Sequence, residues 1–391
     1  MSKISSAEIP GRPTDPEVKL NEVIPRWQPL AGKPFAGKYP ASPVVSNIDS
    51  DSPVLLTLPK IIYAVVGMET RICFLNLVFA DNKQALRFEL ISSVGKSYPD
   101  RWTFTPDAPG NYALKIAVFD SDGQCVGNAA TIIRVAPADA GNGHRAVILT
   151  VGDSIFADGG IVNKHQILLK ASGHDCIRMM GSHSGCGAPL TPDGIAVEAY
   201  GGWKWQCFID RHNGNGNYNS ESKFTRVVDG KNEFILQEYL DKYNDGQAPD
   251  AVIFALGCND IALAEPDNLQ QLIENSFAAR KKLISEFQQI MPDTLIGITL
   301  LPPPNISESA FEQNYHGEIT QKQYSSNQFN YMRQTLLELQ NDSTVSLIPV
   351  YAAIDENMAY PADNALHPDD FGKQQFAETL FAWLKNMMFN C

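Results

Sequence analysis

Three residues of types suited to acyl-transfer chemistry stand where apolar runs end or where a helix-like run begins. Ser154, in GDS, follows the apolar run RAVILT (145–150), and Asn259, in GCND, follows DAVIFAL (250–256). His367, in ALHPDD, lies just before the last helix-like run. A serine hydroxyl attacks a carbonyl once a base takes its proton, and the resulting oxyanion needs fixed hydrogen-bond donors. These three residues can supply a nucleophile, a donor and a base.

Each of these residues, taken alone, also has a purely structural explanation. Asp153 or Ser154 can cap a helix. Asn259 and Asp260 can do the same, and a lone histidine before a helix is structural more often than catalytic. Their joint occurrence at the ends of successive strands of one sheet favours the catalytic interpretation.

The elements that must position these residues follow from the hydrophobic pattern after residue 145. The expected strands are 146–151, 250–256, 293–301 and 344–350, and the expected helices are 159–173, 268–290, 326–340 and 374–388. Such alternation predicts a parallel sheet covered by helices on both faces. Ligands bind at the carboxyl ends of such strands, which here are 152–154, 257–260 and 302–304.

The first third of the chain has a different texture. Residues 1–42 are rich in proline, glycine and charge, and they predict an extended arm. Residues 43–137 contain short β-forming runs separated by turns, which predicts an antiparallel, immunoglobulin-like β-sandwich. Residues 138–145 are expected to be a linker, and 146–391 to form the α/β domain.

Composition limits the classes of partner and compartment. Lys plus Arg is 31 and Asp plus Glu is 44, a net charge of −13 without a basic block, which argues against nucleic acid or an anionic membrane as partner. No run is apolar enough for a membrane helix, and the N-terminus lacks a signal-peptide core. We expect a soluble chain, secreted or periplasmic if a signal peptide has been removed; its oligomeric state stays open. Seven scattered cysteines predict mostly free thiols, or at most one or two bridges.

Four blocks carry a resemblance to a known family: GDS, the glycine of VEAYGGWKWQCF (197–208), GCND and HP. In this order they resemble the blocks of the SGNH (GDSL-type) hydrolases over residues 146–391. The resemblance implies a flavodoxin-like, three-layer α/β/α domain, with Ser154 as nucleophile, His367 as base, and no metal or organic cofactor. It also implies an oxyanion hole formed by the backbone N–H groups of Ser154 and Gly202 and the side-chain amide of Asn259. The preceding sandwich resembles the accessory domain of some carbohydrate-associated members.

The last block departs from the family pattern. The family usually has an aspartate three residues before the histidine, and here that position is Asn364, with Asp363 one residue further back. Either Asn364 orients His367 through its amide oxygen, or a shift of the backbone brings Asp363 into place.

The substrate is suggested by the stretch 203–224, which combines aromatic rings with asparagine amides and so suits a sugar ring better than a lipid tail. Trp203 and Trp205, together with Asp153, are the expected substrate contacts, although both tryptophans could equally fill the core. We expect a serine esterase that hydrolyses short acyl esters, foremost O-acetyl esters, on a small molecule or a glycan. The alternatives are a lysophospholipase or short-chain acylesterase, and a glycan-binding module with a weak or inactive hydrolase domain.

Overall fold

The structure is a computed structural model that describes residues 54–191, 194–210 and 221–388. All of these residues belong to one compact unit, Gly32–Cys391. The expected arm at 1–42 and the first residues of the expected sandwich lie outside the described residues.

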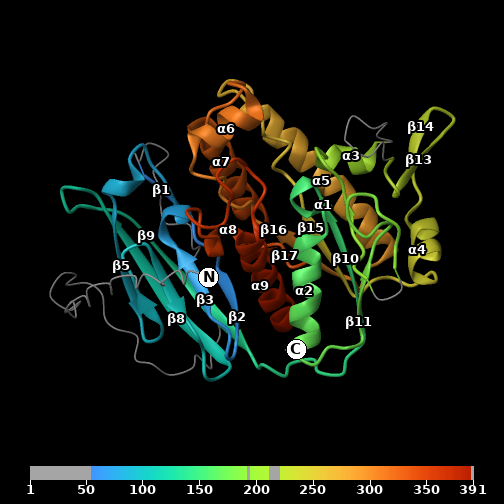
Figure 1. The fold of residues 1–391 in the computed structure, drawn as a ribbon, viewed down its shortest axis with the longest axis horizontal. Coiled ribbons are helices and arrows are strands. Elements are labelled where there is room, and N and C mark those ends of the chain that lie inside the picture. Colours follow the sequence, from blue (N-terminus) through green and yellow to red (C-terminus); the bar gives the residue numbers. More distant parts are fainter. Residues whose placement is uncertain (1–53, 192–193, 211–220, 389–391) are drawn as a thin grey trace, which may run out of the picture. The chain divides into compact units, whose positions relative to one another are not determined.

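The β-rich part of the chain forms several small sheets (Figure 1). Its strands are β1 (Leu55–Leu56), β2 (Ile61–Val65), β3 (Thr70–Cys73), β4 (Val78–Phe79), β5 (Arg87–Ser92), β6 (Lys96–Ser97), β7 (Arg101–Phe104), β8 (Gly110–Phe119) and β9 (Cys125–Ala136). They pair in the orders β2-β9-β8-β5, β3-β7-β6 and β1-β4. Ile72 and Trp102 of the three-stranded sheet share a buried cluster with Leu114 and Ile116 of the four-stranded sheet, which confirms the predicted sandwich.

One pairing differs from the expected antiparallel arrangement. β2 runs parallel to β9, with Ile61 opposite Ile132. β2 and β9 are far apart in the sequence and are not joined by a short turn. A two-residue hairpin turn requires antiparallel strands, so its absence allows the parallel direction here.

The α/β part contains a parallel sheet that follows the predicted pattern. Its strands are β10 (Ala146–Gly152), β11 (Ile177–Met180), β12 (Glu198–Ala199), β15 (Ala251–Ala255), β16 (Leu295–Thr299) and β17 (Ser346–Ile348). The order is β11-β10-β15-β16-β17, with β12 paired to the end of β10. This is the flavodoxin-like order, in which the strand sequence reverses between β10 and β15. Ligands bind at such a reversal, so the ends of β10 and β15 are the expected place for a site.

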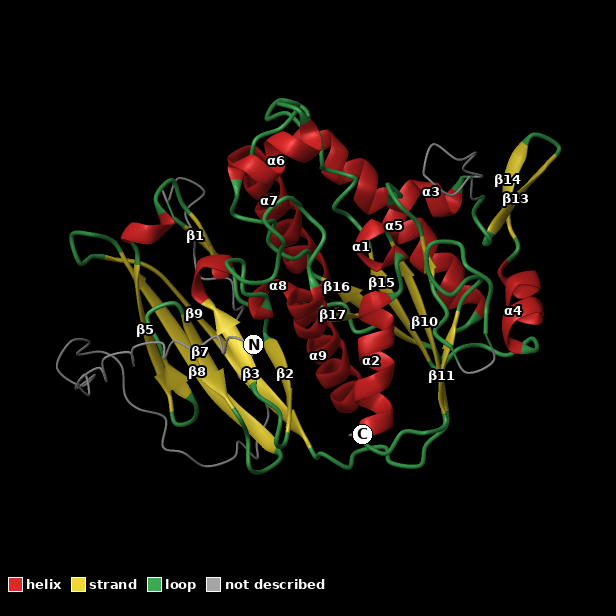
Figure 2. Ribbon diagram, viewed as in Figure 1, coloured by secondary structure: helices red, strands yellow, loops and turns green. Residues whose placement is uncertain are grey.

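Helices cover both faces of this sheet (Figure 2). They are α1 (Ser154–Ala157), α2 (Gly160–Ala171), α3 (Trp205–Ile209), α4 (Leu236–Asn244), α5 (Leu269–Ile290), α6 (Glu308–Tyr315), α7 (Gln321–Leu339), α8 (Val350–Ala353) and α9 (Asp370–Met387). Ile253 of β15 faces the cluster that contains α2 and α9 residues, whereas its neighbour Phe254 faces the cluster that contains α5 residues. This alternation explains why the strand is apolar at every position.

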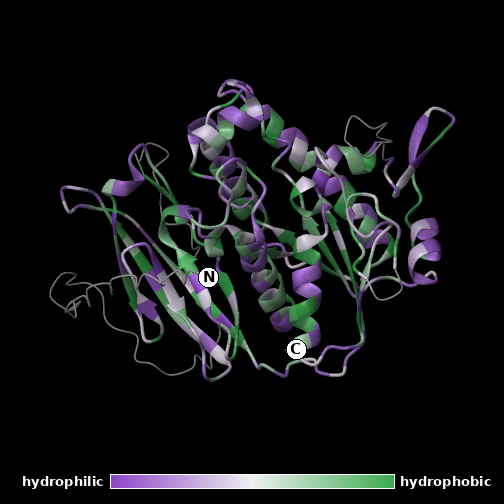
Figure 3. Cartoon of the chain, in the orientation of Figure 1, coloured by the Kyte–Doolittle hydropathy of each residue, from purple (hydrophilic) through white to green (hydrophobic). Residues whose placement is uncertain are grey.

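Some elements were not expected from the sequence. They include β11, β12, the short helices α3, α4, α6 and α8, and a hairpin of β13 (Thr225–Val228) and β14 (Lys231–Phe234). Figure 3 shows that the hairpin is mostly hydrophilic, so it lacks the apolar run that marks the central strands. Helix α7 starts earlier than predicted, because the Thr320 side chain caps it by accepting from the N–H of Gln323.

The β-rich and α/β parts share a core. Phe329 and Met332 of α7 belong to the same buried cluster as Leu114 of the sandwich. Polar contacts reinforce the junction: the Asn76 amide donates to the backbone oxygens of Tyr351 and Ile354, each at 2.7 Å. The sandwich is therefore packed onto the α/β part rather than tethered to it. The domain boundaries inferred from the sequence stay predictions.

Two further expectations concern cysteines and membranes. Cys73, Cys125, Cys176, Cys186, Cys207 and Cys258 are free thiols, as the scattered pattern predicted. No helix within the described ranges is long and apolar enough to span a bilayer.

Candidate active site

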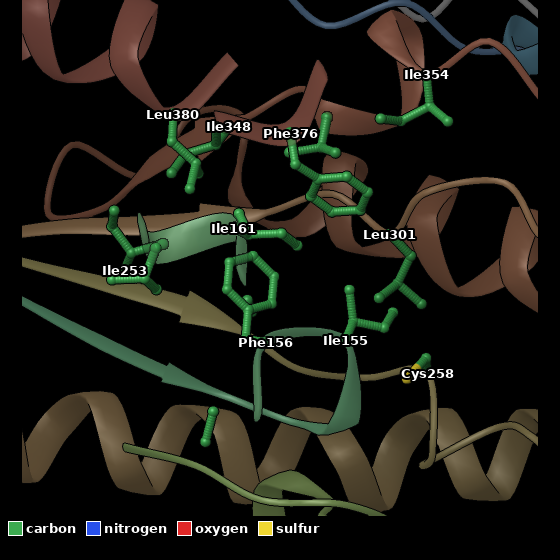
Figure 4. Packing of buried hydrophobic residues seen from close by; sticks show 14 of the residues in the cluster. Ile155, Phe156, Ile161, Ile253, Cys258, Leu301, Ile348, Ile354, Phe376 and Leu380 are labelled. Carbon is green, nitrogen blue, oxygen red and sulfur yellow. The ribbon is translucent and has the colours of Figure 1, made fainter. Parts of the chain in front are cut away.

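Ser154 stands at the turn from β10 into α1. It is the first residue of α1, so its backbone N–H has no acceptor within the helix. Asp153 caps the helix, its Oδ1 accepting from the N–H of Ile155 at 3.1 Å. The next two side chains, Ile155 and Phe156, are buried and point into the core (Figure 4). The turn thus fixes the backbone around Ser154, whose own side chain is half-buried.

The turn containing Gly202 is bonded to the same strand end. The N–H of Tyr200 donates to the oxygen of Gly152 at 3.1 Å, and the N–H of Trp203 donates to the oxygen of Tyr200 at 3.3 Å. Gly202 has φ +76°, and a Cβ there would meet no atom within 4 Å. The glycine is therefore required by the backbone conformation of the turn and not by crowding.

Asn259 connects the end of β15 to this turn. Its Nδ2 donates to the backbone oxygen of Trp203 at 3.0 Å. One amide hydrogen is used in that bond, which leaves the second for a ligand. The preceding Cys258 donates through its thiol to Oδ2 of Asp153 at 2.9 Å. Hydrogen bonds therefore link the segments of Ser154, Gly202 and Asn259 into one edge of the sheet.

His367 is bonded to Asn364. Oδ1 of Asn364 lies 3.0 Å from Nδ1 of His367 and also accepts from the backbone N–H groups of Leu366, at 3.1 Å, and His367, at 2.9 Å. Since two of these partners can only donate, the atom facing them is the amide oxygen, and Nδ1 must carry the proton. Nε2 then keeps a free lone pair, which is the form a general base needs.

Asp363 lies elsewhere. Its side chain is exposed, and its backbone oxygen accepts from the Asn314 amide at 3.2 Å. The loop is held from the other side by Asn305, whose amide donates to the oxygens of Pro361 and Asn364, each at 2.9 Å. The backbone shift that would exchange the two positions is absent from this loop.

Burial sets the ionisation of the site. Loss of water around the ring lowers the pKa of His367, the negative charge of Asp158 raises it, and the positive charge of Lys373 lowers it further. Burial raises the pKa of Asp153 to about 6, against the lowering effect of the bonds from Cys258 and the N–H of Ile155. Burial also raises the pKa of Asp260 to about 7.

The three expected substrate contacts are not at a surface that a substrate could reach. Asp153 is 1% exposed, Trp203 1% and Trp205 0%. Trp203 packs on Tyr200, with ring centroids 4.2 Å apart, and Nε1 of Trp205 donates to the Tyr331 hydroxyl at 3.1 Å. The tryptophans fill the core, where the Trp203 ring finds an aromatic neighbour and the N–H of Trp205 finds an acceptor. Asp153 acts as a helix cap.

The polar part of the same stretch is outside the described residues. Residues 211–220 hold most of the asparagine amides that suggested a sugar ring, namely Asn213, Asn215, Asn217 and Asn219, together with Tyr218. Their role in binding a substrate stays a prediction. Phe208 and Phe224, at either end, are buried and stacked with ring centroids 5.6 Å apart.

The sequence did not reveal a buried carboxylate beside the Gly202 turn. Glu198 is fully buried and accepts from the hydroxyls of Ser182 and Tyr239 at 3.0 and 2.9 Å, and from Tyr200. Glu198 and Tyr200 both belong to the block that precedes Gly202, and their i, i+2 spacing in a strand places them on one face. This spacing was the only sign in the sequence that Glu198 and Tyr200 could lie together.

A groove runs along α2 from Asp158, the residue that follows α1. It has a volume of about 510 Å³ and is lined by Asp158, Asn163, Gln166, Ile167, Lys170 and Ser184, among others. The α2 residues are spaced by three or four positions and therefore share a face. From Gly160 to Lys170 this face is about 15 Å long, at 1.5 Å per helical residue.

Residues 148–380 match the GDSL-like lipase/acylhydrolase family. The chain belongs to this family. It is therefore an esterase of the SGNH type, as the four blocks predicted. No curated protein matches the sequence.

Solved structures with a similar fold include three carbohydrate esterases. The family 3 carbohydrate esterase of Clostridium thermocellum is 18% identical, with a TM-score of 0.40, 62% of this chain covered and 97% of the other. The family 3 carbohydrate esterase of Talaromyces cellulolyticus is 16% identical, with a TM-score of 0.38 and coverages of 63% and 99%. A carbohydrate acetylesterase family member from Sinorhizobium meliloti is 14% identical, with a TM-score of 0.36 and coverages of 62% and 99%.

Proposed function

We propose that this esterase removes short acyl groups, foremost O-acetyl groups, from a carbohydrate. Ser154 Oγ attacks the acyl carbonyl while Nε2 of His367 takes the hydroxyl proton. The N–H groups of Ser154 and Gly202 and the Asn259 amide donate to the oxyanion. His367 then protonates the departing sugar oxygen, which leaves as the hydroxyl, and water releases the acyl group from Ser154 by the same two steps, with His367 again as base and then acid.

Asn364 fills the place of the triad acid in this scheme. Its amide oxygen holds the proton on Nδ1, so that Nε2 faces the nucleophile as a base. An amide carries no charge and stabilises the imidazolium less than a carboxylate does. We infer that the enzyme is active, with a lower kcat than an aspartate at this position would give.

The groove along α2 supports a carbohydrate as the substrate. It starts at Asp158, four residues after Ser154, and its wall combines amides and a hydroxyl with the exposed side chain of Ile167. Mixed donors, acceptors and small apolar surfaces suit a sugar chain, whereas a long lipid tail needs continuous apolar walls. The sugar on the leaving side of the ester lies along this groove.

Acetate release tests the activity. Acetylated xylo-oligosaccharides, acetylated chito-oligosaccharides, p-nitrophenyl acetate and p-nitrophenyl palmitate are offered to the wild type, to Ser154→Ala, and to the control Ser285→Ala on the exposed side of α5. We expect turnover of the acetyl esters, loss only in Ser154→Ala, and little hydrolysis of the palmitate. Preference for the palmitate, or no ester hydrolysis by the wild type, would overturn the proposal.

A second comparison tests the groove. Asn163→Tyr places a ring in it, and Gln271→Tyr places the same ring on exposed α5. We expect Asn163→Tyr to lower kcat/KM for the acetylated oligosaccharide used by the wild type roughly tenfold or more, with p-nitrophenyl acetate unaffected. Equal effects on both substrates, or an equal effect of Gln271→Tyr, would remove the sugar chain from the groove.

A further inference from the structure

A carboxylate that the proposed mechanism does not use lies directly before the Gly202 turn. Glu198 is 0% exposed, and both of its oxygens accept hydrogen bonds. Oε1 accepts from the hydroxyls of Ser182, at 3.0 Å, and Tyr200. Oε2 accepts from the backbone N–H of Ser182, at 3.0 Å, and from the Tyr239 hydroxyl, at 2.9 Å. Four donors therefore surround a side chain without access to solvent, and they offset the cost of burying it.

These donors come from three separate segments of the α/β part. Ser182 follows β11, Tyr239 lies in α4, and Tyr200 directly precedes the turn that contains Gly202. Glu198 therefore ties the Tyr200 side chain to two segments that lie outside the turn.

Tyr200 is in turn connected to two of the proposed oxyanion donors. Its ring packs on that of Trp203, with centroids 4.2 Å apart, and its backbone oxygen accepts from the N–H of Trp203 at 3.3 Å. Gly202 lies between these two bonded residues. The oxygen of Trp203 accepts from Nδ2 of Asn259 at 3.0 Å. A movement of Tyr200 would therefore displace the N–H of Gly202 and the amide of Asn259 together.

The hydrogen bond to Glu198 adds a constraint that ring packing does not give. The Tyr200 ring contacts Trp203 on one side and His183, with centroids 5.1 Å apart, on another. Ring contacts tolerate a range of offsets, whereas a hydrogen bond weakens steeply when its length or angle changes. The carboxylate therefore fixes the hydroxyl end of the ring, and with it the position of the ring over Trp203.

We propose that Glu198 positions the oxyanion hole, holding Tyr200 so that the Gly202 N–H and the Asn259 amide are directed at one oxygen. The inference rests on the proposed function, because it takes Ser154 as the nucleophile and these groups as donors. Glu198 acts through Tyr200 and not on the substrate, so it is a positioning residue. Donors of this kind stabilise charge that develops in the transition state, and a displaced hole lowers kcat with little change in KM.

The test uses Glu198→Gln, Tyr200→Phe and the double variant. Glutamine keeps the size of the side chain and replaces one acceptor oxygen by a donor group, and phenylalanine keeps the ring and removes only the hydroxyl. We expect each single substitution to lower kcat for p-nitrophenyl acetate roughly ten- to a hundredfold, with KM changed less than about threefold. The double variant should lose little more than Tyr200→Phe alone, because the carboxylate acts through the hydroxyl that is already absent.

Two matched substitutions separate positioning from loss of stability. Tyr239→Phe removes a hydroxyl from the same carboxylate, but on α4. Tyr351→Phe removes a buried hydroxyl that donates to the oxygen of Thr57 at 3.2 Å, in the cluster shared with the sandwich. Both should lower the melting temperature about as much as Tyr200→Phe, since each removes one buried hydrogen bond. We expect kcat to fall less in Tyr239→Phe than in Tyr200→Phe, and to stay unchanged in Tyr351→Phe.

Hydrogen exchange followed by mass spectrometry gives a measurement that does not depend on activity. The N–H groups of Tyr200 and Trp203 donate to backbone oxygens, so a peptide covering 198–204 reports on the turn. We expect exchange in this peptide to be roughly tenfold or more faster in Glu198→Gln and Tyr200→Phe than in the wild type, and unchanged in Tyr351→Phe.

A loss of kcat at nearly constant KM that is not additive in the double variant supports the inference. Losses that follow the melting temperature in all variants, or that multiply in the double variant, overturn it. If Glu198→Gln does not fold, the comparison of Tyr200→Phe with the two tyrosine controls decides.

Failure of the proposed function is recognised separately, by a wild type that hydrolyses no ester or by hydrolysis that survives in Ser154→Ala. In that case faster exchange at 198–204, confined to Glu198→Gln and Tyr200→Phe, still supports Glu198 as the residue that holds the turn. Unchanged exchange in these two variants overturns this role as well.

Discussion

Oδ1 of Asn364 receives Nδ1 of His367 at 3.0 Å together with two backbone N–H groups of the same loop. This amide occupies the position that an aspartate usually fills in the family. Its oxygen fixes the tautomer of the ring, and it brings no charge. The consequences can be separated by substitution.

Replacing Asn364 tests its orienting role. Asn364→Asp keeps the acceptor and adds a charge, so we expect kcat to stay or rise. Asn364→Ala removes the acceptor, and we expect kcat to fall roughly tenfold or more, because nothing then holds the proton on Nδ1 of His367 or fixes the orientation of the ring. Asp363→Ala is the matched control and should change kcat little. Loss of turnover in Asp363→Ala with an active Asn364→Ala would show that the carboxylate is the third member.

Asn259→Ala should act on the transition state. We expect kcat to fall by roughly two to three orders of magnitude with KM little changed, because an oxyanion donor interacts with charge that develops only during the reaction. The bond from Asn259 to Trp203 is lost as well, so the melting temperature is measured in parallel. An effect confined to KM would remove Asn259 from the oxyanion hole.

Gly202→Ala separates strain from function. The φ of +76° costs an alanine roughly 1 kcal/mol, and no atom lies within 4 Å of the new Cβ. Gly67, in the β-rich part, has φ +81° and the same open space, so Gly67→Ala should cost similar stability. We expect only Gly202→Ala to lower kcat as well, because relaxation of its turn moves the N–H. Equal activity in both variants would contradict a catalytic role for this glycine.

The activity should rise with pH through the ionisation of His367. The base must be neutral, so the protonated enzyme is inactive. Loss of water around the ring lowers the pKa of His367, and we therefore expect the midpoint of the kcat/KM profile to lie below the usual histidine pKa of about 6.5. Initial rates with p-nitrophenyl acetate between pH 4.5 and 9 measure it. A flat profile with chemistry rate-limiting would argue against His367 as base.

Asp260 should make the fold less stable as pH rises. Burial raises its pKa to about 7, so between about pH 4 and 7 the folded chain holds a proton that the unfolded chain releases. The free energy of unfolding falls as the pH rises through this range. Above about pH 7 the whole destabilisation caused by the ionised, buried Asp260 is present. Asp260→Asn removes the cost.

We expect the stability gain of Asp260→Asn over the wild type to grow with pH, from little at pH 4 to roughly 1–3 kcal/mol at pH 8, measured by urea unfolding at several pH values. Asp122→Asn, in an exposed turn, is the control and should show no such gain. A gain that does not change with pH would contradict the ionisation of Asp260 as its cause.

The sequence by itself determined the chemistry-bearing blocks and the central sheet. Runs such as 146–149 and 251–256 are apolar at every position because both faces of these strands are buried, and this pattern needs no tertiary information to be read. The polar residues after them, Ser154 and Asn259, then had to lie at one edge, since parallel strands end together. The family match at residues 148–380 is consistent with that reading.

The tertiary structure decided matters that depend on contacts between distant segments. Asn364 and Asp363 are adjacent and both polar, and only the fold of the loop places the first on His367 and leaves the second exposed. A tryptophan suits a pocket wall and a core equally well, and the partners of Trp203 and Trp205 assign them to the core. Asp158 and Lys373 form an ion pair and lie 215 residues apart, so no local pattern could have paired them. Local pattern shows which residue types are available at the end of a strand, but charges and rings act through space, and the fold alone sets those distances.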